Sequence, residues 1–141
     1  MAEFSAVTEQ EVAVNGNVLF TDTTSACTRG YITHRSGSGQ IQLKGATTNS
    51  RAKYRVEFSG NIAVPTTGTA GEVGLAIAID GESDLSTLAV ATPTVTDSYF
   101  NVAMATDVWL PCGCCERVTV KNASAQAVNV KNANITVNRI G

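Results

Sequence analysis

Three cysteines that lie close together have the spacing most suggestive of chemistry in this chain. Cys112, Cys114 and Cys115 fall within four positions, while Cys27 and His34 stand far upstream. Zinc takes thiolate and imidazole ligands in a tetrahedron, so Cys27 or His34 could complete a site with the cluster. Alternatively, Cys27 could form a disulfide with Cys112, Cys114 or Cys115. We favour a third interpretation, in which the thiols are small apolar side chains in a buried or interfacial turn.

The remaining candidates for chemistry are a lone histidine and an acidic turn. No motif places a nucleophile beside His34 and Arg35, so we expect a surface or interface histidine. Asp80, Glu82 and Asp84 surround a turn, but they lack the length and glycine placement of a helix–loop–helix calcium loop, which favours a solvated turn. We therefore predict a protein that is not an enzyme and has no cofactor and no bound metal.

The composition predicts one domain with little affinity for nucleic acid or lipid. The chain has 141 residues, with 10 basic and 12 acidic residues and a formal charge of -2. Its Lys and Arg residues form no basic stripe, which would be the footprint of nucleic-acid binding. Residues 1–20 do not resemble a signal peptide, and no apolar run approaches the ~20 residues of a membrane helix. We expect synthesis in a cytosol, with reduced thiols.

The stretch Glu72–Glu82 has the clearest structural pattern. Large apolar residues occupy every second position from Val73 to Ile79, and Gly or Ala fills the positions between them. Such alternation is typical of a strand, and here the large face predicts a core contact while the small face lets another layer approach. Asp80-Gly81 then predicts a tight hairpin turn, whose central positions need positive φ.

The same alternation, followed by turn residues, recurs along the rest of the chain, and helical spacing is nowhere sustained. We expect further extended segments at 11–20, 31–35, 40–44, 51–64, 86–95, 98–105, 108–111, 116–122 and 127–140. The last of these carries a predicted kink or bulge near Asn132-Ala133. Residues 21–30 read as loop, and residues 1–10 as an N-terminal arm that is either frayed or docked on another molecule.

This pattern predicts an all-β antiparallel sandwich of two sheets over residues 11–141, with a jelly roll as the first choice. An immunoglobulin-like sandwich is second, because the only tryptophan, Trp109, lies beside the cysteine cluster and breaks the spacing of that fold.

Several segments resemble one family of jelly rolls. They are Asn17-Val-Leu-Phe20, Lys53-Tyr-Arg-Val-Glu-Phe58, Gly74-Leu-Ala-Ile-Ala-Ile-Asp-Gly-Glu82 and a closing pair of apolar strands. Their layout resembles the compact trimeric jelly rolls of the tumour necrosis factor and complement globular-head kind. Stand-alone chains of this pattern are similar to small virion proteins of tailed bacteriophages. The resemblance implies a homotrimer displayed on a virion that is assembled in a bacterial cytoplasm.

Two functions follow from this resemblance. The first is a structural virion protein, a capsid decoration or head-fibre protein that binds the major capsid protein or another virion protein through the arm with Phe4 and Val7. The alternative is a receptor- or glycan-binding module of a phage fibre, which would bind through the loops 66–71 or 83–87. For the trimer interface we predict aromatic and β-branched residues, namely Tyr54, Phe58, Phe100, Val102 and Val137.

Overall fold

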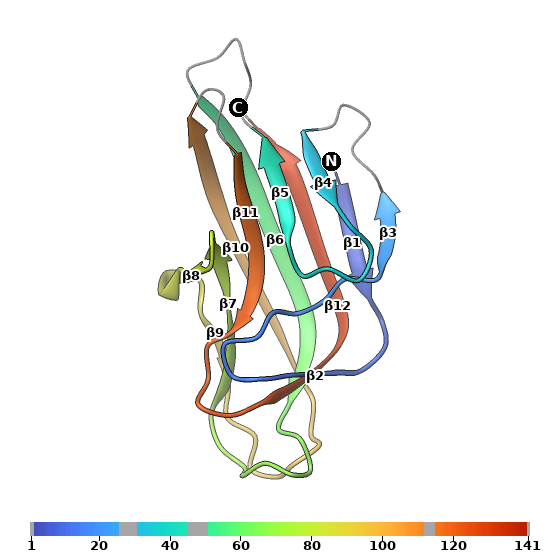
Figure 1. Ribbon diagram of the computed structural model, residues 1–141. Helices are drawn as coiled ribbons and strands as arrows, with labels where there is room; N and C mark the ends of the chain where they lie inside the picture. Colours follow the sequence, from blue (N-terminus) through green and yellow to red (C-terminus); the bar gives the residue numbers. More distant parts are fainter. Residues whose placement is uncertain (1, 26–30, 45–50, 112–114, 141) are drawn as a thin grey trace.

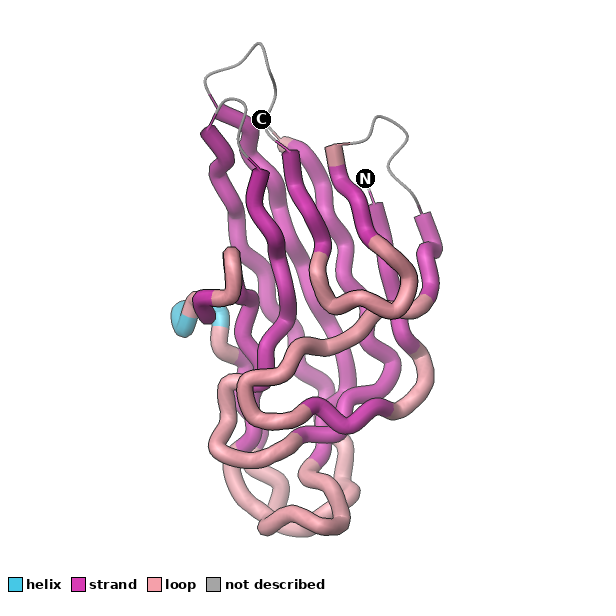
Figure 2. Tube along the Cα trace, viewed as in Figure 1, coloured by secondary structure: helices cyan, strands magenta, loops and turns pink. Residues whose placement is uncertain are grey.

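In the described part of the chain, two antiparallel sheets of six strands each pack face to face and enclose the apolar side chains between them (Figure 1). The structure is a computed structural model that describes residues 2–25, 31–44, 51–111 and 115–140. Strands and loops make up nearly all of this part of the chain, and its one helical element is the short 3-10 turn η1, Leu85–Thr87 (Figure 2). The fold is an all-β jelly roll, as the sequence predicted.

Sheet A contains the longest strands. Its order is β10-β6-β12-β1-β3, and β2 also pairs with β12. The strands are β1 (Ala2–Ala6), β2 (Gln10–Val12), β3 (Asp22–Ser25), β6 (Arg51–Ala63), β10 (Phe100–Pro111) and β12 (Val128–Arg139).

Sheet B contains shorter strands in the order β4-β5-β11-β7-β8, and β9 also pairs with β7. The strands are β4 (Ile32–His34), β5 (Ile41–Lys44), β7 (Val73–Ile79), β8 (Glu82–Ser83), β9 (Ala89–Ala91) and β11 (Cys115–Asn122).

The side chains that point inward at every second position of the strands fill the space between the sheets. On β6, Tyr54, Val56 and Phe58 are buried, whereas Arg55 and Glu57 face outward. This is the phase that the sequence predicted, because successive side chains of a strand point to opposite faces.

Aromatic contacts and one buried hydroxyl add to this packing. The ring of Phe20 meets that of Phe58 edge to face, with centroids 6.3 Å apart. The Tyr54 hydroxyl donates a hydrogen bond of 2.7 Å to the carbonyl of Lys44, which satisfies the polar end of a buried ring.

Strand β7 is buried on both faces, and each face is buried for a different reason. Val73, Leu75 and Ile77 enter the core, while the small face lies beneath η1 and β9. A Cβ on Gly74 would lie 2.9 Å from Val90 Cγ1, closer than such atoms normally approach, so only glycine fits there. The close approach predicted from the small residues is therefore confirmed.

The predicted turns and bulge also occur. Asp80 and Gly81 have φ of 52° and 87°, as the predicted turn requires. In β12 the pairing with β6 shifts register between Lys131 and Asn134, and Asn132 has a φ of 53°. The irregularity lies where the sequence predicted a kink or bulge.

The N-terminal residues differ from the prediction. Ala2–Ala6 form β1, an inner strand of sheet A that pairs with β12 and β3, and Phe4 is only 3% exposed. Phe4 therefore packs in the core of this chain, whereas Val7 is exposed, and their role as a capsid-docking arm stays a prediction. We did not predict β1 from the sequence, because five residues with a single large apolar side chain show too little periodicity.

Two further segments differ from the sequence prediction. Asp22–Ser25 were predicted to be loop but form β3. Their side chains are polar, yet their backbone pairs with the edge of β1, whose N–H and C=O groups need hydrogen-bond partners. Segments 98–105 and 108–111 were predicted to be separate but form one strand, β10, which pairs with β6 along its whole length. A membrane-spanning helix is not found among the described residues.

Candidate subunit interface on sheet A

The outward side of β6, β10 and β12 forms a surface of small and polar residues, which we call the sheet A face. Alternation places these side chains opposite the core, and the register aligns them in rows across the strands. The residues are Lys53, Arg55, Glu57, Ser59, Asn101, Ala103, Ala105, Asp107, Trp109, Asn134, Thr136 and Asn138.

The middle of the sheet A face is hollowed. Ala105, Glu57 and Thr136 form one row, and Ala103, Ser59 and Asn134 form the next. Short side chains in both rows leave a hollow of about 490 Å³ above the sheet. Ala is depleted on strands, so two exposed alanines on one strand expose a flat surface to which another polypeptide can pack closely.

Two exposed aromatic residues lie on β10, but only Trp109 shares the outward phase of Ala103 and Ala105, since Phe100 has the phase of Val102 and Met104. Phe100 begins the strand and is 46% exposed, whereas Trp109 lies near its end and is 51% exposed. Within the described part of the chain, β10 pairs only with β6, so these rings lie on an edge strand. Large aromatic side chains at the surface are typical of binding sites between proteins.

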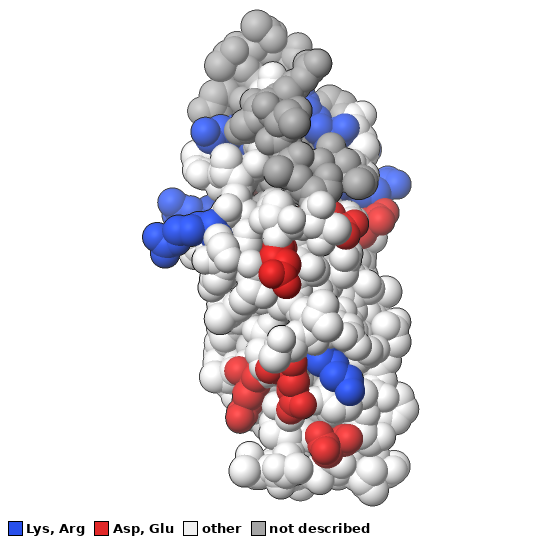
Figure 3. Space-filling view, turned by 90° about the vertical axis from the view of Figure 1, so that its right-hand side faces the viewer, with Lys and Arg blue, Asp and Glu red and all other residues white. Residues whose placement is uncertain are grey.

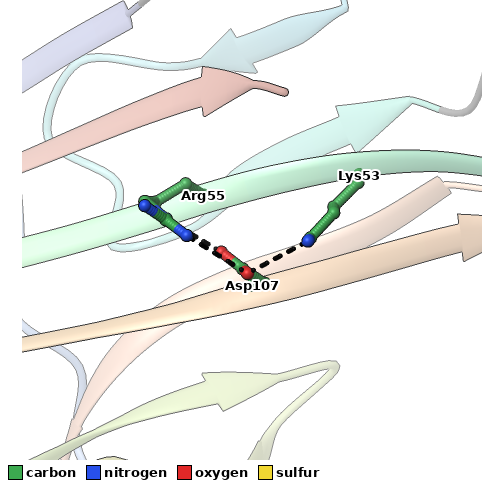
Figure 4. Close-up of polar contacts among 3 residues, drawn as sticks. All are labelled: Lys53, Arg55 and Asp107. Atoms are coloured by element: carbon green, nitrogen blue, oxygen red, sulfur yellow. Dashed lines mark hydrogen bonds and ion pairs between the residues drawn. The ribbon is translucent and has the colours of Figure 1, made fainter. Parts of the chain in front are cut away.

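Lys53 and Arg55 of β6 form an ion-pair cluster with Asp107 of β10 (Figure 4). Arg55 Nε donates a hydrogen bond of 3.0 Å to Asp107 Oδ1, and Lys53 Nζ lies 3.3 Å from Asp107 Oδ2. The Lys53 ammonium also lies 4.8 Å from the centre of the Trp109 ring, within the range of a cation–π contact.

The cluster changes the acidity of its members. Hydrogen bonds from Arg55 and then Lys53 lower the pKa of Asp107, and the carboxylate in turn raises the pKa of Arg55. Asp107 and Arg55 therefore stay charged at neutral pH.

The residues predicted for the trimer interface lie in two environments. Phe100 is exposed, whereas Tyr54, Phe58, Val102 and Val137 are at most 6% exposed. These four point into the core of the same chain, which leaves little of their side-chain area for a partner. Their place in an interface stays a prediction.

Sequence reasoning took the large residues as interface candidates and passed over the small ones. Ala103, Ala105 and Trp109 have the opposite phase to Val102 and Met104, so alternation alone could have identified the sheet A face.

The other candidate residues are scattered. Cys115 is exposed at the start of β11, and Cys27, Cys112 and Cys114 lie outside the described residues, so the disulfide stays a prediction. The His34 ring lies against Phe4 with centroids 4.5 Å apart, and its Nε2 lies 2.7 Å from the Ser38 carbonyl. Within the described ranges, no three His, Cys, Asp or Glu side chains gather in a way that could hold a metal ion.

Two members of the acidic turn have separate structural roles. The Asp80 carboxylate accepts a hydrogen bond of 2.9 Å from the backbone N–H of Arg117. Asp84 caps η1 by accepting from the N–H of Ser86 at 3.1 Å. Glu82 is exposed in β8.

Charges elsewhere are mixed. On the face shown in Figure 3, Lys and Arg are separated by uncharged side chains and by Asp and Glu. This agrees with the even distribution of charge along the sequence.

Comparison with known proteins shows the fold. The structure is similar to an Eiger tumour necrosis factor from S. frugiperda, with 11% identity, a TM-score of 0.68, and coverage of 99% of this chain and 91% of that one. The globular domain of zebrafish complement 1qA protein has 10% identity and a TM-score of 0.56, covering 96% and 94%. PRD1 vertex protein P5 has 14% identity and a TM-score of 0.50, covering 99% and 97%. No family model and no curated protein sequence matches this chain.

Proposed function

We propose that this chain is a non-enzymatic structural protein of a bacteriophage virion, a capsid decoration or head-fibre protein that assembles as a homotrimer through the sheet A face. The observation that carries the proposal is the combination of a hollow of small side chains with an exposed aromatic residue, Trp109, on the same face of edge strand β10.

The shape of the sheet A face supports assembly. A partner that inserts side chains above Ala103 and Ala105 can approach the sheet closely and bury the ring of Trp109 at the same time. Burial of a large aromatic side chain contributes up to several kcal/mol, and such anchors dominate the energetics of interfaces. The fixed ion-pair cluster around Asp107 leaves few long side chains to be ordered on binding.

The fold likeness supports the choice of a trimer on a virion. The sequence resembles the trimeric jelly rolls of the tumour necrosis factor kind, and the structure shares the fold of two such domains. It also shares the fold of a phage vertex protein along nearly the whole of both chains. Three copies around one axis would give a virion protein several attachment points, and therefore avidity, without a deep pocket.

Sedimentation of matched arginine variants tests the assembly. Ala105→Arg places a long charged side chain in the hollow and is expected to give a monomer. Thr33→Arg adds the same charge to an exposed position of β4 on the opposite sheet and is expected to stay trimeric. Circular dichroism of both variants would show whether each keeps the fold. Identical sedimentation of folded Ala105→Arg and the unmodified chain would reject this interface.

Electron cryomicroscopy of purified particles tests the location on the virion. We expect density for three copies of this jelly roll on the outside of the capsid or at the tip of a head fibre. Its absence from particles that contain the chain by mass spectrometry would contradict the location without affecting the trimer.

A further inference from the structure

A second hollow lies on the outward side of sheet B, far from the residues that carry the proposed assembly. It has a volume of about 460 Å³ and lies over β11, between the turn at Asp80-Gly81 and the loop that precedes Val18. Polar side chains line it, chiefly Asn15, Asn17, Gln40, Arg117, Thr119 and Lys121.

Two buried polar atoms in this hollow lack a protein partner. Thr119 is only 4% exposed, and its hydroxyl has no hydrogen-bond partner within the described ranges. The side-chain carbonyl oxygen of Asn17 is also buried and has no hydrogen-bond partner within the described ranges. Leaving a buried polar group unpaired costs about 1–3 kcal/mol, so a native structure normally supplies a partner. Both atoms belong to residues that line the hollow, and a polar ligand there could satisfy them.

The hollow continues into a neighbouring one across β5. The neighbour has a volume of about 590 Å³ and shares Gln40 and Arg117 with the first. Thr33, Gln42 and Arg117 stand in one row across β4, β5 and β11. The two hollows thus form one polar groove, and each has a volume typical of a small-molecule site.

The charges along this groove favour an anion. Arg35, Arg117 and Lys121 are basic, whereas Asp80 is the one acidic residue that lines it among the described positions. The Lys121 ammonium already donates to the Gly81 carbonyl at 2.7 Å. The Arg117 guanidinium has no ion-pair partner within the described part of the chain, and it lies where the two hollows meet.

We propose that this groove binds an acidic saccharide. Amides of Asn and Gln and hydroxyls of Thr both donate and accept, as the neighbouring hydroxyl groups of a sugar ring require. The guanidinium of Arg117 can bind a carboxylate through two parallel hydrogen bonds. Inorganic sulfate has only acceptor oxygens, so it could accept from the Thr119 hydroxyl but would leave the Asn17 carbonyl without a donor.

The groove is independent of the proposed assembly. It lies on the outward side of sheet B, whereas the sheet A face lies on the outward side of the other layer. A trimer formed through sheet A would therefore leave all three grooves open. Because the core separates the two surfaces, binding and assembly can be measured separately.

Isothermal titration of the full chain with trigalacturonic acid tests the proposal. We expect Arg117→Gln to weaken binding by about tenfold or more through loss of the carboxylate contact. Thr119→Val removes the hydroxyl and keeps the shape of the side chain, so it should weaken binding while the melting temperature stays equal or rises. The neutral sugar maltotriose should bind more weakly than the acidic trimer.

Control variants lie outside the groove. Lys131→Gln removes one positive charge from β12, and Thr66→Val removes an exposed hydroxyl from the loop after β6, so both should bind as the unmodified chain does. Equal binding by all four variants, no binding of trigalacturonic acid, or equally strong binding of inorganic sulfate would each overturn the proposal. Sedimentation of the same samples separates such a result from failure of the assembly.

Discussion

The outward surfaces of the two sheets differ, although both sheets obey the same alternation. The sheet A face has short side chains at its centre and the exposed ring of Trp109 near the end of one strand, so it is suited to another protein surface. The sheet B groove has amides, arginines and an unpaired buried hydroxyl, so it is suited to a small polar ligand. The core requires the inward residues of both sheets to be apolar, and only the outward residues are free to differ in function.

The largest expected effect is on the framework that both surfaces share. Phe4→Ala removes a buried ring that joins β1 of sheet A to His34 of β4 in sheet B. We expect a loss of about 3–4 kcal/mol in the free energy of unfolding, measured by urea denaturation. A loss below about 1 kcal/mol would mean that residues 2–6 act as an arm, and that sheet A lacks its inner strand.

A second variant should separate the two surfaces. The buried Asn122 amide donates to the carbonyls of Val12 and Gln126 at 3.0 and 2.9 Å, and its oxygen accepts from the Ser124 backbone. It thereby holds the loop with Asn15 and Asn17 beside β11.

Asn122→Ala should therefore destabilise the chain by about 2–3 kcal/mol in denaturant and weaken saccharide binding. Trimer formation below the melting temperature should be unchanged. Loss of the trimer in a chain that is still folded would contradict the separation of the two surfaces.

Trp109→Ala tests the sheet A face with a smaller expected effect on stability. The ring is 51% exposed in one chain, so its loss should lower the stability of the monomer by less than about 1 kcal/mol. Its loss from an interface should weaken association by about tenfold or more, as measured by sedimentation equilibrium. The matched variant Gln42→Ala on sheet B should leave association unchanged, and equal behaviour of the two variants would remove Trp109 from the interface.

The smallest expected effect is a dependence on pH. Arg55 and Lys53 hold the pKa of Asp107 below its ordinary value of 3.8. A lowered pKa in the folded state gives stability that is present above the ordinary value and is lost as the pH falls through the lowered one.

The stability of the folded chain should therefore fall slightly as the pH drops below about 4, and Asp107→Asn should remove that part of the dependence, as measured by urea denaturation. An Asp107→Asn chain with the same acid sensitivity as the unmodified chain would assign the effect to other groups.

The sequence predicted those elements whose side chains alternate clearly, and missed those formed by pairing alone. Glu72–Glu82 and Arg51–Val64 were found because large apolar residues occupy one phase. Ala2–Ala6 and Asp22–Ser25 were missed because each becomes a strand only when its neighbour supplies hydrogen bonds.

The surfaces were harder to predict than the core. Core positions require bulky apolar residues, and such residues, including Tyr54 and Phe58, were the ones predicted for the interface. Outward positions can carry many different residues without affecting the fold, so their pattern is harder to recognise. The sheet B groove needs Asn17, Gln40 and Thr119 from three distant segments, and their proximity depends on the complete strand order.

Sedimentation equilibrium of the unmodified chain at low micromolar concentration is the most direct test of the central claim that the sheet A face joins identical subunits. We expect a mass of about three times the 14.7 kDa chain. A single species of 14.7 kDa that persists as the protein concentration is raised would contradict it.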